Sequence, residues 1–317
     1  GGSSVFKNVK QQLNKVSQTN SRVLISGPSG SGKELIARWI HKKSNRNSFP
    51  FIIASCATLS PERVEQVLFG WSEKLNDDQS SQYSVGLFEQ ANNGTLFFDE
   101  ICDLPIQTQG KLVQAIQDQS FYKLGSNKKI NVDVRVISAS NKNLLKSMEE
   151  GILREDLFYR LSVAPIEVPY LNNRGEDIND LVEYFLKFIS KELGSNNLQL
   201  SSETIVVLQN YDWPGNIRQL KNIIEWLIIM YSNQKDLVIM PSQLPLEILG
   251  YNEKKNHDNK INNFSLSLKD ARKIFEANYL NEQLKRFKGN IAKTSTFIGM
   301  DRSALHRKLK ELNISIN

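Results

Sequence analysis

The sequence contains little cysteine and no long apolar run. Only two of its 317 residues are cysteines, Cys56 and Cys102, which lie far apart, without metal-ligand spacing, in segments that we expect to be buried. A disulfide-rich fold is therefore excluded. The longest apolar stretch, residues 223–230, is interrupted by Glu225 and is well short of the ~18 residues that a membrane span needs. The N-terminal residues do not have the pattern of a signal peptide, and the two isolated cysteines fit a reducing compartment, so we predict a cytoplasmic protein with no membrane partner.

Basic charge is concentrated at the C-terminal end. The last 53 residues, from Ser265, contain 11 Lys and Arg against 5 Asp and Glu, which accounts for the whole net charge of +6. The first 264 residues balance 29 basic against 29 acidic side chains. A basic module on a neutral body predicts a polyanionic partner such as nucleic acid. A solvated charged tail is the alternative.

Periodicity divides the chain into four segments. Residues 1–170 alternate apolar strands with helical segments, which is typical of a parallel βαβ sheet. Residues 171–249 are expected to form a helical unit, residues 250–264 a polar linker, and residues 265–317 a second helical unit. Strands are expected at residues 22–26, 51–54, 95–98 and 132–138.

Apolar spacing also predicts which helix faces are buried. Two helices are expected between Asp177 and Met230. The first should place on one face Leu181, Tyr184, Phe185 and Phe188. Beyond the linker, a helix that ends at Gly289 should bury Ile274, Ala277, Leu280, Leu284 and Phe287.

A glycine-rich segment, GPSGSGKE, follows the first expected strand. Its spacing is that of a phosphate-binding loop, and it opens a helix expected over residues 34–43. Three glycines let backbone N–H groups turn inward, and a lysine at the helix N-terminus can reach the outer phosphates of ATP. An ordinary glycine-rich turn is the alternative. The predicted ATP-binding residues are Gly27, Pro28, Ser29, Gly30, Ser31, Gly32, Lys33 and Glu34.

Two carboxylates end the apolar strand in GTLFFDE. Glu34 stands where most phosphate loops carry Ser or Thr as a Mg²⁺ ligand, so the metal must be held by other residues. Asp99 is the candidate Mg²⁺ ligand, and Glu100 is the candidate group that polarises the attacking water. A solvated Asp-Glu loop is the alternative.

Five motifs resemble, in order, the AAA+ domain of bacterial enhancer-binding proteins, the activators of sigma-54 RNA polymerase. They are GPSGSGKE, GTLFFDEICDLP, VDVRVISASNKNL, REDLFYRL and YDWPGNIRQL. The C-terminal GMDRSALHRKLK resembles the Fis-type helix-turn-helix of that family and is particularly similar to NtrX-like nitrogen-regulation response regulators. The resemblance implies an AAA+ P-loop NTPase with a doubly wound parallel sheet, a helical lid over residues 171–249 and an all-α DNA-binding module.

The resemblance also assigns roles to single residues. It implies that Ser140 and Asn141 sense the γ-phosphate. Arg154 and Arg160 would reach the ATP of a neighbouring subunit, where an added Arg stabilises transition-state charge. Arg218 would be the lid residue that contacts nucleotide. From spacing alone, each of these arginines would be assigned to the solvated surface.

Two departures from the family pattern bear on function. Between Phe69-Gly70 and Gly86 the family inserts a GAFTGA loop that touches sigma-54, whereas this chain reads WSEKLNDDQSSQYSV, which argues against sigma-54 contact. Ser55 stands where the family usually has an Asn that restrains the catalytic glutamate. Because Ser is shorter, we expect that restraint to be weakened.

Residues 290–312 are expected to form a helix-turn-helix with its turn at Gly299. Leu305, Leu309 and Leu312 should face its core. Arg302 and Ser303, at the start of the second helix, are the first candidates for base contacts because that end enters the groove. Lys293 and Lys308 are expected to contact phosphates, and Arg307 and Lys310 are suited to phosphates or base edges. His306 is equally suited to a phosphate contact, to packing or to base readout. A charged three-helix bundle is the alternative.

Three functions fit these observations. The first is a regulator that binds ATP and double-stranded DNA and acts through promoter occupancy. The second is an ATPase that remodels sigma-54 RNA polymerase, and the third is an AAA+ remodeller unrelated to transcription. The chain begins Gly1-Gly2 without Met, so we expect that a receiver domain, the partner of a sensor kinase, has been removed. A dimer through the C-terminal module and a hexameric or heptameric ring are implied by the family.

Overall fold

The computed structural model describes residues 1–74, 81–194, 198–232, 237–249, 267–286, 290–312 and 314. The chain forms two compact units. The first comprises Gly1–Tyr184 and Asp212–Ile224, and the second comprises Phe185–Tyr211 and Glu225–Asn317. Among the residues so described, no helix has the length and apolar character needed to cross a bilayer.

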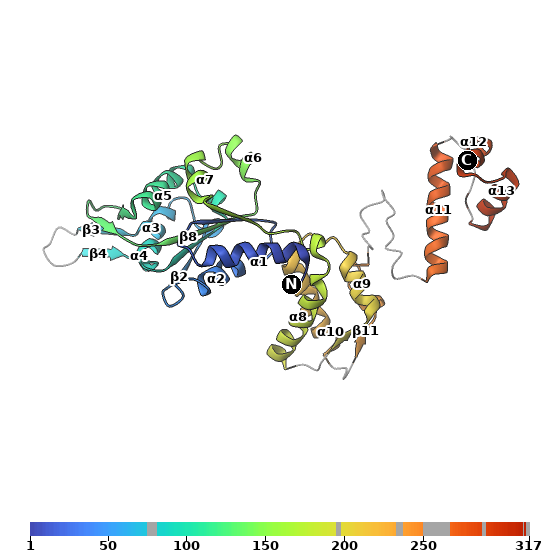
Figure 1. Ribbon diagram of the computed structural model, residues 1–317, viewed down its shortest axis with the longest axis horizontal. Helices are drawn as coiled ribbons and strands as arrows, with labels where there is room; N and C mark the ends of the chain where they lie inside the picture. Colours follow the sequence, from blue (N-terminus) through green and yellow to red (C-terminus); the bar gives the residue numbers. More distant parts are fainter. Residues whose placement is uncertain are drawn as a thin grey trace. The chain divides into compact units, whose positions relative to one another are not determined.

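A five-stranded parallel sheet forms the centre of the first unit (Figure 1). Its strand order is β2-β5-β8-β1-β9, so β1 lies between β8 and β9 although it comes first in the chain. The bounds are β1 Val23–Ser26, β2 Phe51–Ser55, β5 Thr95–Asp99, β8 Arg135–Ser140 and β9 Ala164–Glu167. Because all strands run the same way, the residues that follow β1, β5 and β8 meet at one edge.

Helices cover both faces of this sheet, as successive side chains of a strand point to opposite sides. On one face, Phe97 and Ile137 pack with the apolar sides of α1 and α2. On the other, Leu96, Phe98 and Val136 pack with α3, α5 and α7. The α-helices that lie wholly within this unit are α1 Ser4–Ser17, α2 Lys33–Lys42, α3 Val64–Phe69, α4 Leu87–Gln90, α5 Ile106–Asp118, α6 Leu144–Glu149 and α7 Glu155–Leu161. The doubly wound sheet is confirmed.

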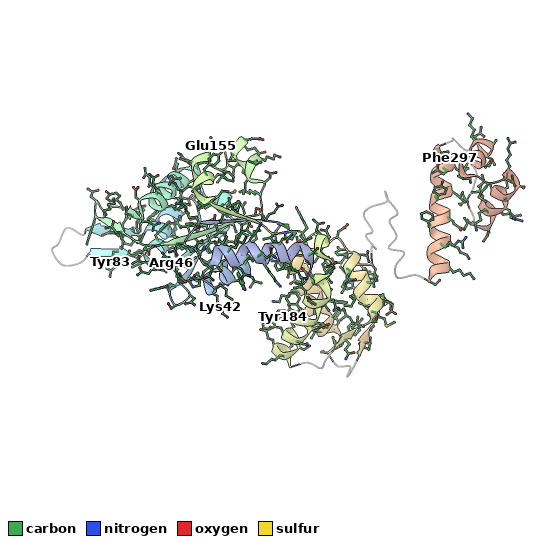
Figure 2. The ribbon with its side chains drawn as sticks, in the orientation of Figure 1. Lys42, Arg46, Tyr83, Glu155, Tyr184 and Phe297 are labelled. Carbon is green, nitrogen blue, oxygen red and sulfur yellow. The ribbon has the colours of Figure 1, made fainter. Side chains whose placement is uncertain are left out.

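Two short hairpins project from the first unit. One pairs β3 (Trp71–Lys74) with β4 (Ser81–Ser84), and the other pairs β6 (Ser120–Tyr122) with β7 (Lys129–Asn131). Backbone hydrogen bonds join them, because Ser72 N donates to Leu124 O and Leu124 N donates to Gly70 O. Tyr83, on β4, carries a largely exposed ring at this end of the unit (Figure 2).

Helix α8 (Asp177–Leu193) buries a different stripe from the predicted one. Tyr184 and Phe188 are 59% and 45% exposed, and Leu181 is half-buried. The buried positions are Ile178, Val182, Phe185 and Ile189. Both stripes have helical spacing, so packing rather than periodicity selects between them. The two helices expected to dominate residues 177–230 are α8 and α10 (Asn216–Tyr231), and a shorter helix, α9 (Ser202–Asn210), comes between them in the sequence.

The expected strand at 132–138 begins later in the structure, at Arg135. Gln119 explains the delay, since its backbone carbonyl accepts from Val132 N and its side-chain oxygen accepts from Val134 N. These donors are therefore not available to a neighbouring strand.

The second unit contains α9, the parallel pair β10 (Gln199–Leu200) and β11 (Val238–Ile239), and three C-terminal helices. These are α11 Leu268–Arg286, α12 Ile291–Ile298 and α13 Arg302–Glu311. Leu280, Leu284, Leu305 and Leu309 form their buried core, with Leu312 half-buried. The expected linker at 250–264, the side chain of Ile274, and Phe287 and Gly289 lie outside the described residues.

Candidate nucleotide site and DNA-binding module

The glycine-rich loop leaves β1 at the edge where the strands end, and it leads directly into α2. Gly27, Gly30 and Gly32 have φ values of 153°, 74° and 97°, which side chains rarely allow. A Cβ on Gly30 would lie 2.4 Å from Gly215 O, and one on Gly27 would lie 2.7 Å from Val168 O. The two glycines are needed both for their backbone angles and for this close approach.

Lys33 projects back across the loop from the first turn of α2. Its side chain is 6% exposed, and Nζ donates to Gly27 O at 3.0 Å and Pro28 O at 3.3 Å. Nζ also lies 3.3 Å from Glu100 Oε1. The buried ammonium is thus satisfied by two carbonyls and one carboxylate, which places a positive charge inside the loop.

Ser31 supplies a hydroxyl that other residues leave unbonded. Ser31 is 2% exposed, and among the described residues its Oγ has no hydrogen-bond partner. A buried hydroxyl without a partner costs free energy, so a ligand oxygen at this point would be favoured. Together with the ammonium of Lys33, this fits an anionic ligand such as a nucleotide phosphate.

Asp99 and Glu100 end β5 beside the loop, as predicted. Burial raises the pKa of Asp99, and the neighbouring charge of Glu100 raises it further. Glu100 adopts a left-handed backbone with φ of 57°, which turns its carboxylate towards β8. There Glu100 Oε2 accepts from Asn141 N at 2.7 Å. Ser55 is the register partner of Asp99 on β2.

Asp99 is the carboxylate predicted to bind Mg²⁺. In the described part of the chain, no group of three or more His, Cys, Asp or Glu side chains is arranged to hold a metal ion. Mg²⁺ is commonly held by one or two carboxylates together with substrate phosphates. Asp99 is compatible with that arrangement. Glu34 instead forms an exposed ion pair with Arg38 at 2.8 Å.

Ser140 and Asn141 follow one another at the end of β8 but lie in different surroundings. Ser140 is fully buried, and its Oγ donates to Cys102 Sγ at 3.4 Å and accepts from Lys142 N at 3.1 Å. Asn141 is exposed and uses its backbone N–H on Glu100. Asn141 is therefore the one of the two whose side chain is open to solvent.

Arg154 and Arg160 lie at the two ends of α7, away from the loop in sequence. Arg154 is exposed, and its guanidinium donates to both oxygens of Asp156 at 3.0 and 2.8 Å. This pairing raises its pKa. Arg160 donates to Gln117 Oε1 at 2.7 Å. The structure records no contact of either with the glycine-rich loop among the residues it describes.

Arg218 does reach the loop, and two other side chains do so as well. Arg218 Nη1 lies 3.4 Å from Ser29 Oγ, and its backbone N donates to Gly30 O. Arg174 and Asn216, which were not predicted from the sequence, donate to loop carbonyls from separate segments. Asn216 lies within the motif YDWPGNIRQL. The Pro and Gly that precede it indicate a turn, which is the sequence feature that could have pointed to Asn216.

The C-terminal helices form the expected helix-turn-helix. Gly299 ends α12 in the left-handed conformation with φ of 70°, and α13 begins at Arg302. The predicted contacts that are exposed are Lys293, Arg302, Ser303, His306, Arg307 and Lys310. Lys308 is half-buried and pairs with Glu276 at 2.8 Å, so part of its charge is already used within the module.

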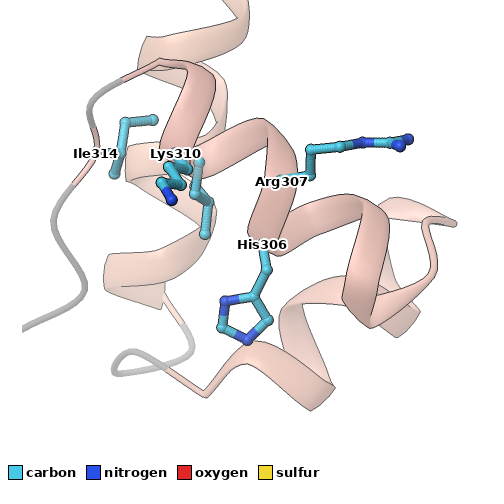
Figure 3. A pocket seen from close by; sticks show the side chains of 5 residues that line it. His306, Arg307, Lys310 and Ile314 are labelled. Atoms are coloured by element: carbon cyan, nitrogen blue, oxygen red, sulfur yellow. The ribbon is translucent and has the colours of Figure 1, made fainter.

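An open pocket of about 500 Å³ lies on the surface beside α13 (Figure 3). Its apolar lining comes from Leu309 and Ile314, and its basic lining from Lys310, His306 and Arg307. Arg307 points away from His306 and Lys310 in Figure 3. The basic side chains thus leave the helix in more than one direction, and no single face carries all of them.

Three family models match the chain. Residues 1–167 match the sigma-54 interaction domain, residues 172–261 the AAA+ ATPase lid domain, and residues 271–312 the bacterial regulatory proteins of the Fis family. The first of these matches alone covers more than half of the 317 residues.

Named relatives resemble the whole chain. The nitrogen assimilation regulatory protein NtrX of Azorhizobium caulinodans is 43% identical over 99% of this chain and 68% of its own length. A putative response regulator NtrX-like of Rickettsia felis is 43% identical over 100% of this chain and 66% of its length. The crystal structure of Brucella abortus NtrX with ADP has a TM-score of 0.74 at 42% identity, over 99% of this chain and 69% of that one. The chain thus spans about two thirds of these relatives.

Proposed function

The chain belongs to the sigma-54 interaction domain family and has that family's AAA+ P-loop fold, helical lid and Fis-type helix-turn-helix, and we propose that it is an ATP-binding, DNA-binding transcription regulator. It is the output part of an NtrX-like response regulator. The observation that carries the proposal is the glycine-rich loop, in which the buried Lys33 ammonium lies 3.3 Å from Glu100 Oε1 and close enough to Asp99 for its charge to act on that carboxylate. Crystal structures of Brucella abortus NtrX contain ADP or ATP.

The loop residues Gly27 to Glu34 hold the phosphates in this proposal. Lys33 exchanges its present partners, Gly27 O, Pro28 O and Glu100, for phosphate oxygens. That exchange frees Glu100 Oε1, while Asn141 N keeps the other oxygen in place. Glu100 is then positioned to orient and polarise a water molecule.

Asp99 is proposed as the protein ligand of Mg²⁺, which would neutralise developing phosphate charge. Its raised pKa follows from burial next to Glu100, and a divalent cation would relieve that repulsion. Ser140 supports this edge through Cys102 and Lys142, whereas Asn141 and Arg218 are the exposed side chains proposed to contact phosphate.

Arg154 and Arg160 are proposed to act on the nucleotide of a neighbouring subunit. Arg154 is exposed and both arginines are held by short polar contacts, which suits groups that present a guanidinium to a partner. The partner is a second copy of this chain in a hexameric or heptameric ring. Phe275 and Tyr279 on α11, both exposed and stacked with centroids 6.2 Å apart, support a dimer through the C-terminal module.

The C-terminal module is proposed to bind double-stranded DNA. Arg302 and Ser303 begin α13 and are exposed, as readers of base edges must be. The net charge of +6 lies wholly in this part of the chain. The proposed boundaries are 1–170, 171–249, 250–264 and 265–317. The family matches span residues 1–167, 172–261 and 271–312, so the first boundary lies close to theirs, whereas the lid match runs through most of the proposed linker.

Promoter occupancy is the mode of action that we favour. The segment between Gly70 and Gly86 has no GAFTGA motif, and contact with sigma-54 RNA polymerase depends on that motif in the family. The longer relatives are response regulators, so a receiver domain addressed by a sensor kinase is part of the proposal. The alternative, an ATPase that remodels sigma-54 polymerase, is favoured by the family match itself.

Two measurements on one preparation test this function. Fluorescent ADP and ATP should bind the wild-type protein and should bind at least tenfold more weakly to Lys33→Ala, whereas Lys42→Ala at the other end of α2 should leave both affinities unchanged. In a band-shift assay, the same preparation should reduce the electrophoretic mobility of a specific DNA duplex. Absence of nucleotide binding would contradict the proposal. ATP-dependent open complexes with sigma-54 holoenzyme would instead support the remodelling alternative.

A further inference from the structure

The glycine-rich loop is held from outside by donors of other segments. Three consecutive carbonyls accept hydrogen bonds: Ser29 O from Asn216 Nδ2 at 3.1 Å, Gly30 O from Arg218 N at 3.2 Å, and Ser31 O from Arg174 Nη2 at 3.3 Å. In a trans peptide the carbonyl and the following N–H point in opposite directions. Each contact therefore also fixes the direction of one N–H group.

Of the three N–H groups fixed in this way, two have no acceptor in the described part of the chain, and these are the two that Asn216 and Arg174 control. Ser31 N is used within the loop, where it donates to Pro28 O at 3.3 Å. Gly30 N and Gly32 N have no acceptor among the described residues. Gly30 N belongs to the peptide that Asn216 holds, and Gly32 N belongs to the peptide that Arg174 holds.

Asn216 is fixed on both sides of its amide. It is fully buried, its Oδ1 accepts from Leu171 N at 2.9 Å, and its Nδ2 donates to Ser29 O. The two partners assign the amide orientation, since a flipped amide would face an N–H with its NH₂ group. Its backbone has φ of 50°, a conformation that Asn tolerates better than most residues.

Arg174 is also buried, at 4% exposure, and lies 4.9 Å above the ring of Phe6 on α1. Burial lowers its pKa, and the charge of Asp177 opposes that effect. Asp177 accepts in turn from Ser3 N and Ser3 Oγ at 2.7 and 3.0 Å. The guanidinium that holds the loop therefore packs on α1 through Phe6 and lies within the electrostatic influence of Asp177 at the start of α8, while its Nε has no hydrogen-bond partner among the described residues.

We propose that Asn216 and Arg174 are positioning residues of the phosphate site, which aim Gly30 N and Gly32 N at the nucleotide by holding the carbonyls of Ser29 and Ser31. The inference rests on the proposed nucleotide-binding function. It predicts that the two side chains act on phosphate recognition without touching the ligand. Pre-aligned donors require no reorganisation on binding, which is how such groups increase affinity.

The test measures affinities for fluorescent AMP, ADP and ATP in the full chain, with the melting temperature of each variant without nucleotide. Asn216→Gly removes the side chain at a backbone angle that glycine accepts. Asn93→Gly is the matched control, because Asn93 also has positive φ, 63°, but precedes β5 at the opposite edge of the sheet. Arg174→Met keeps an apolar stem against Phe6 and removes the donor to Ser31 O, and it provides the test if Asn216→Gly does not fold.

We expect Asn216→Gly and Arg174→Met to weaken ADP and ATP binding about tenfold, as for one lost hydrogen bond in a buried site, with AMP affinity within about twofold of wild type. Asn93→Gly should leave the affinities for AMP, ADP and ATP unchanged. Equal losses for AMP, ADP and ATP would show a general structural role and overturn the inference, as would unchanged ADP affinity. If the wild-type protein itself fails to bind ADP, the proposed function fails, and the inference fails with it.

Discussion

Arg135 is a charged side chain that lies almost wholly inside the first unit. It is 2% exposed, and burial lowers its pKa to about 10. Nε donates to Ser21 O at 3.3 Å and Nη2 donates to Val16 O at 2.9 Å. The guanidinium thus ties the end of α1 to the first residue of β8.

Replacing Arg135 with Ala should lower the free energy of unfolding by about 3 kcal/mol, because two carbonyls lose a charged donor and a cavity remains. Arg135→Met should cost less, since it fills the space without burying a charge. Chemical denaturation measures both. Arg38→Ala, an exposed arginine with an ion pair to Glu34, is the control and should cost under about 1 kcal/mol. Equal losses at the two positions would contradict the role of Arg135.

Asp99 should respond to pH because its pKa is raised above the ordinary 3.8 by burial and by Glu100. A carboxylate whose folded pKa is raised costs stability when ionised, and that cost disappears as pH falls through the raised pKa. Asp99→Asn should therefore raise the melting temperature of the nucleotide-free protein at pH 7. If the variant melts lower than wild type, the direction of this shift is wrong.

The same carboxylate should make nucleotide binding depend on Mg²⁺ and on pH. Mg²⁺ should increase ATP affinity at pH 8, and the increase should fade as pH is lowered towards the raised pKa, earlier than for an ordinary aspartate. Titrations with and without Mg²⁺ across this range measure the effect. Asp99→Asn should lack the Mg²⁺-dependent increase at every pH, and an increase that survives in this variant would exclude Asp99 as the ligand.

At the scale of single elements, the strands that could be predicted from the sequence are those whose apolar residues show that the strand is buried. The strands at β1, β2 and β5 were correct within one residue because they carry continuous apolar runs. Strand β9 was missed because it lies at the sheet edge, contains Pro165, and buries only Ile166 fully. An edge strand accepts Pro and needs little apolar alternation, so its sequence carries a weak signal.

The candidate site shows the same division. Gly27, Lys33 and Asp99 were predicted from local spacing, and the structure places them together at one edge. Arg174 and Asn216 were not, because their contacts with the loop join positions 143 and 187 residues apart in the chain. Tertiary hydrogen bonds of this kind leave no periodic pattern in the sequence.

Helix α13 should read DNA mainly through its first turn. Arg302→Ala is expected to weaken binding to a specific duplex by about 1–3 kcal/mol and to leave binding to a scrambled duplex nearly unchanged. Lys310→Ala should weaken both about equally and reduce the salt dependence by about one charge, as a phosphate contact does. Band-shift titrations at several salt concentrations separate the two. Equal loss on both duplexes for Arg302→Ala would remove it from base readout.

At the scale of the whole molecule, the question is whether neighbouring copies complete each other's sites. The glycine-rich loop and Glu100 lie together within one copy, joined through Lys33. Arg154, whose guanidinium is exposed and paired with Asp156, makes no loop contact within the described residues. An assembled ATPase should therefore show hydrolysis per subunit that rises cooperatively with protein concentration.

Mixing two inactive variants gives the sharpest test of this arrangement. Glu100→Gln should abolish hydrolysis in its own site, and Arg154→Ala should lower it by about 10³-fold or more by removing the charge that a neighbour supplies. A random equal mixture should regain about a quarter of wild-type activity, because half of the sites retain Glu100 and half of those adjoin a copy that retains Arg154. A mixture of Arg38→Ala with Arg154→Ala is the control for nonspecific stabilisation of the Arg154→Ala protein by a second protein. If Arg154 acted within its own subunit, the mixture would stay as inactive as its components.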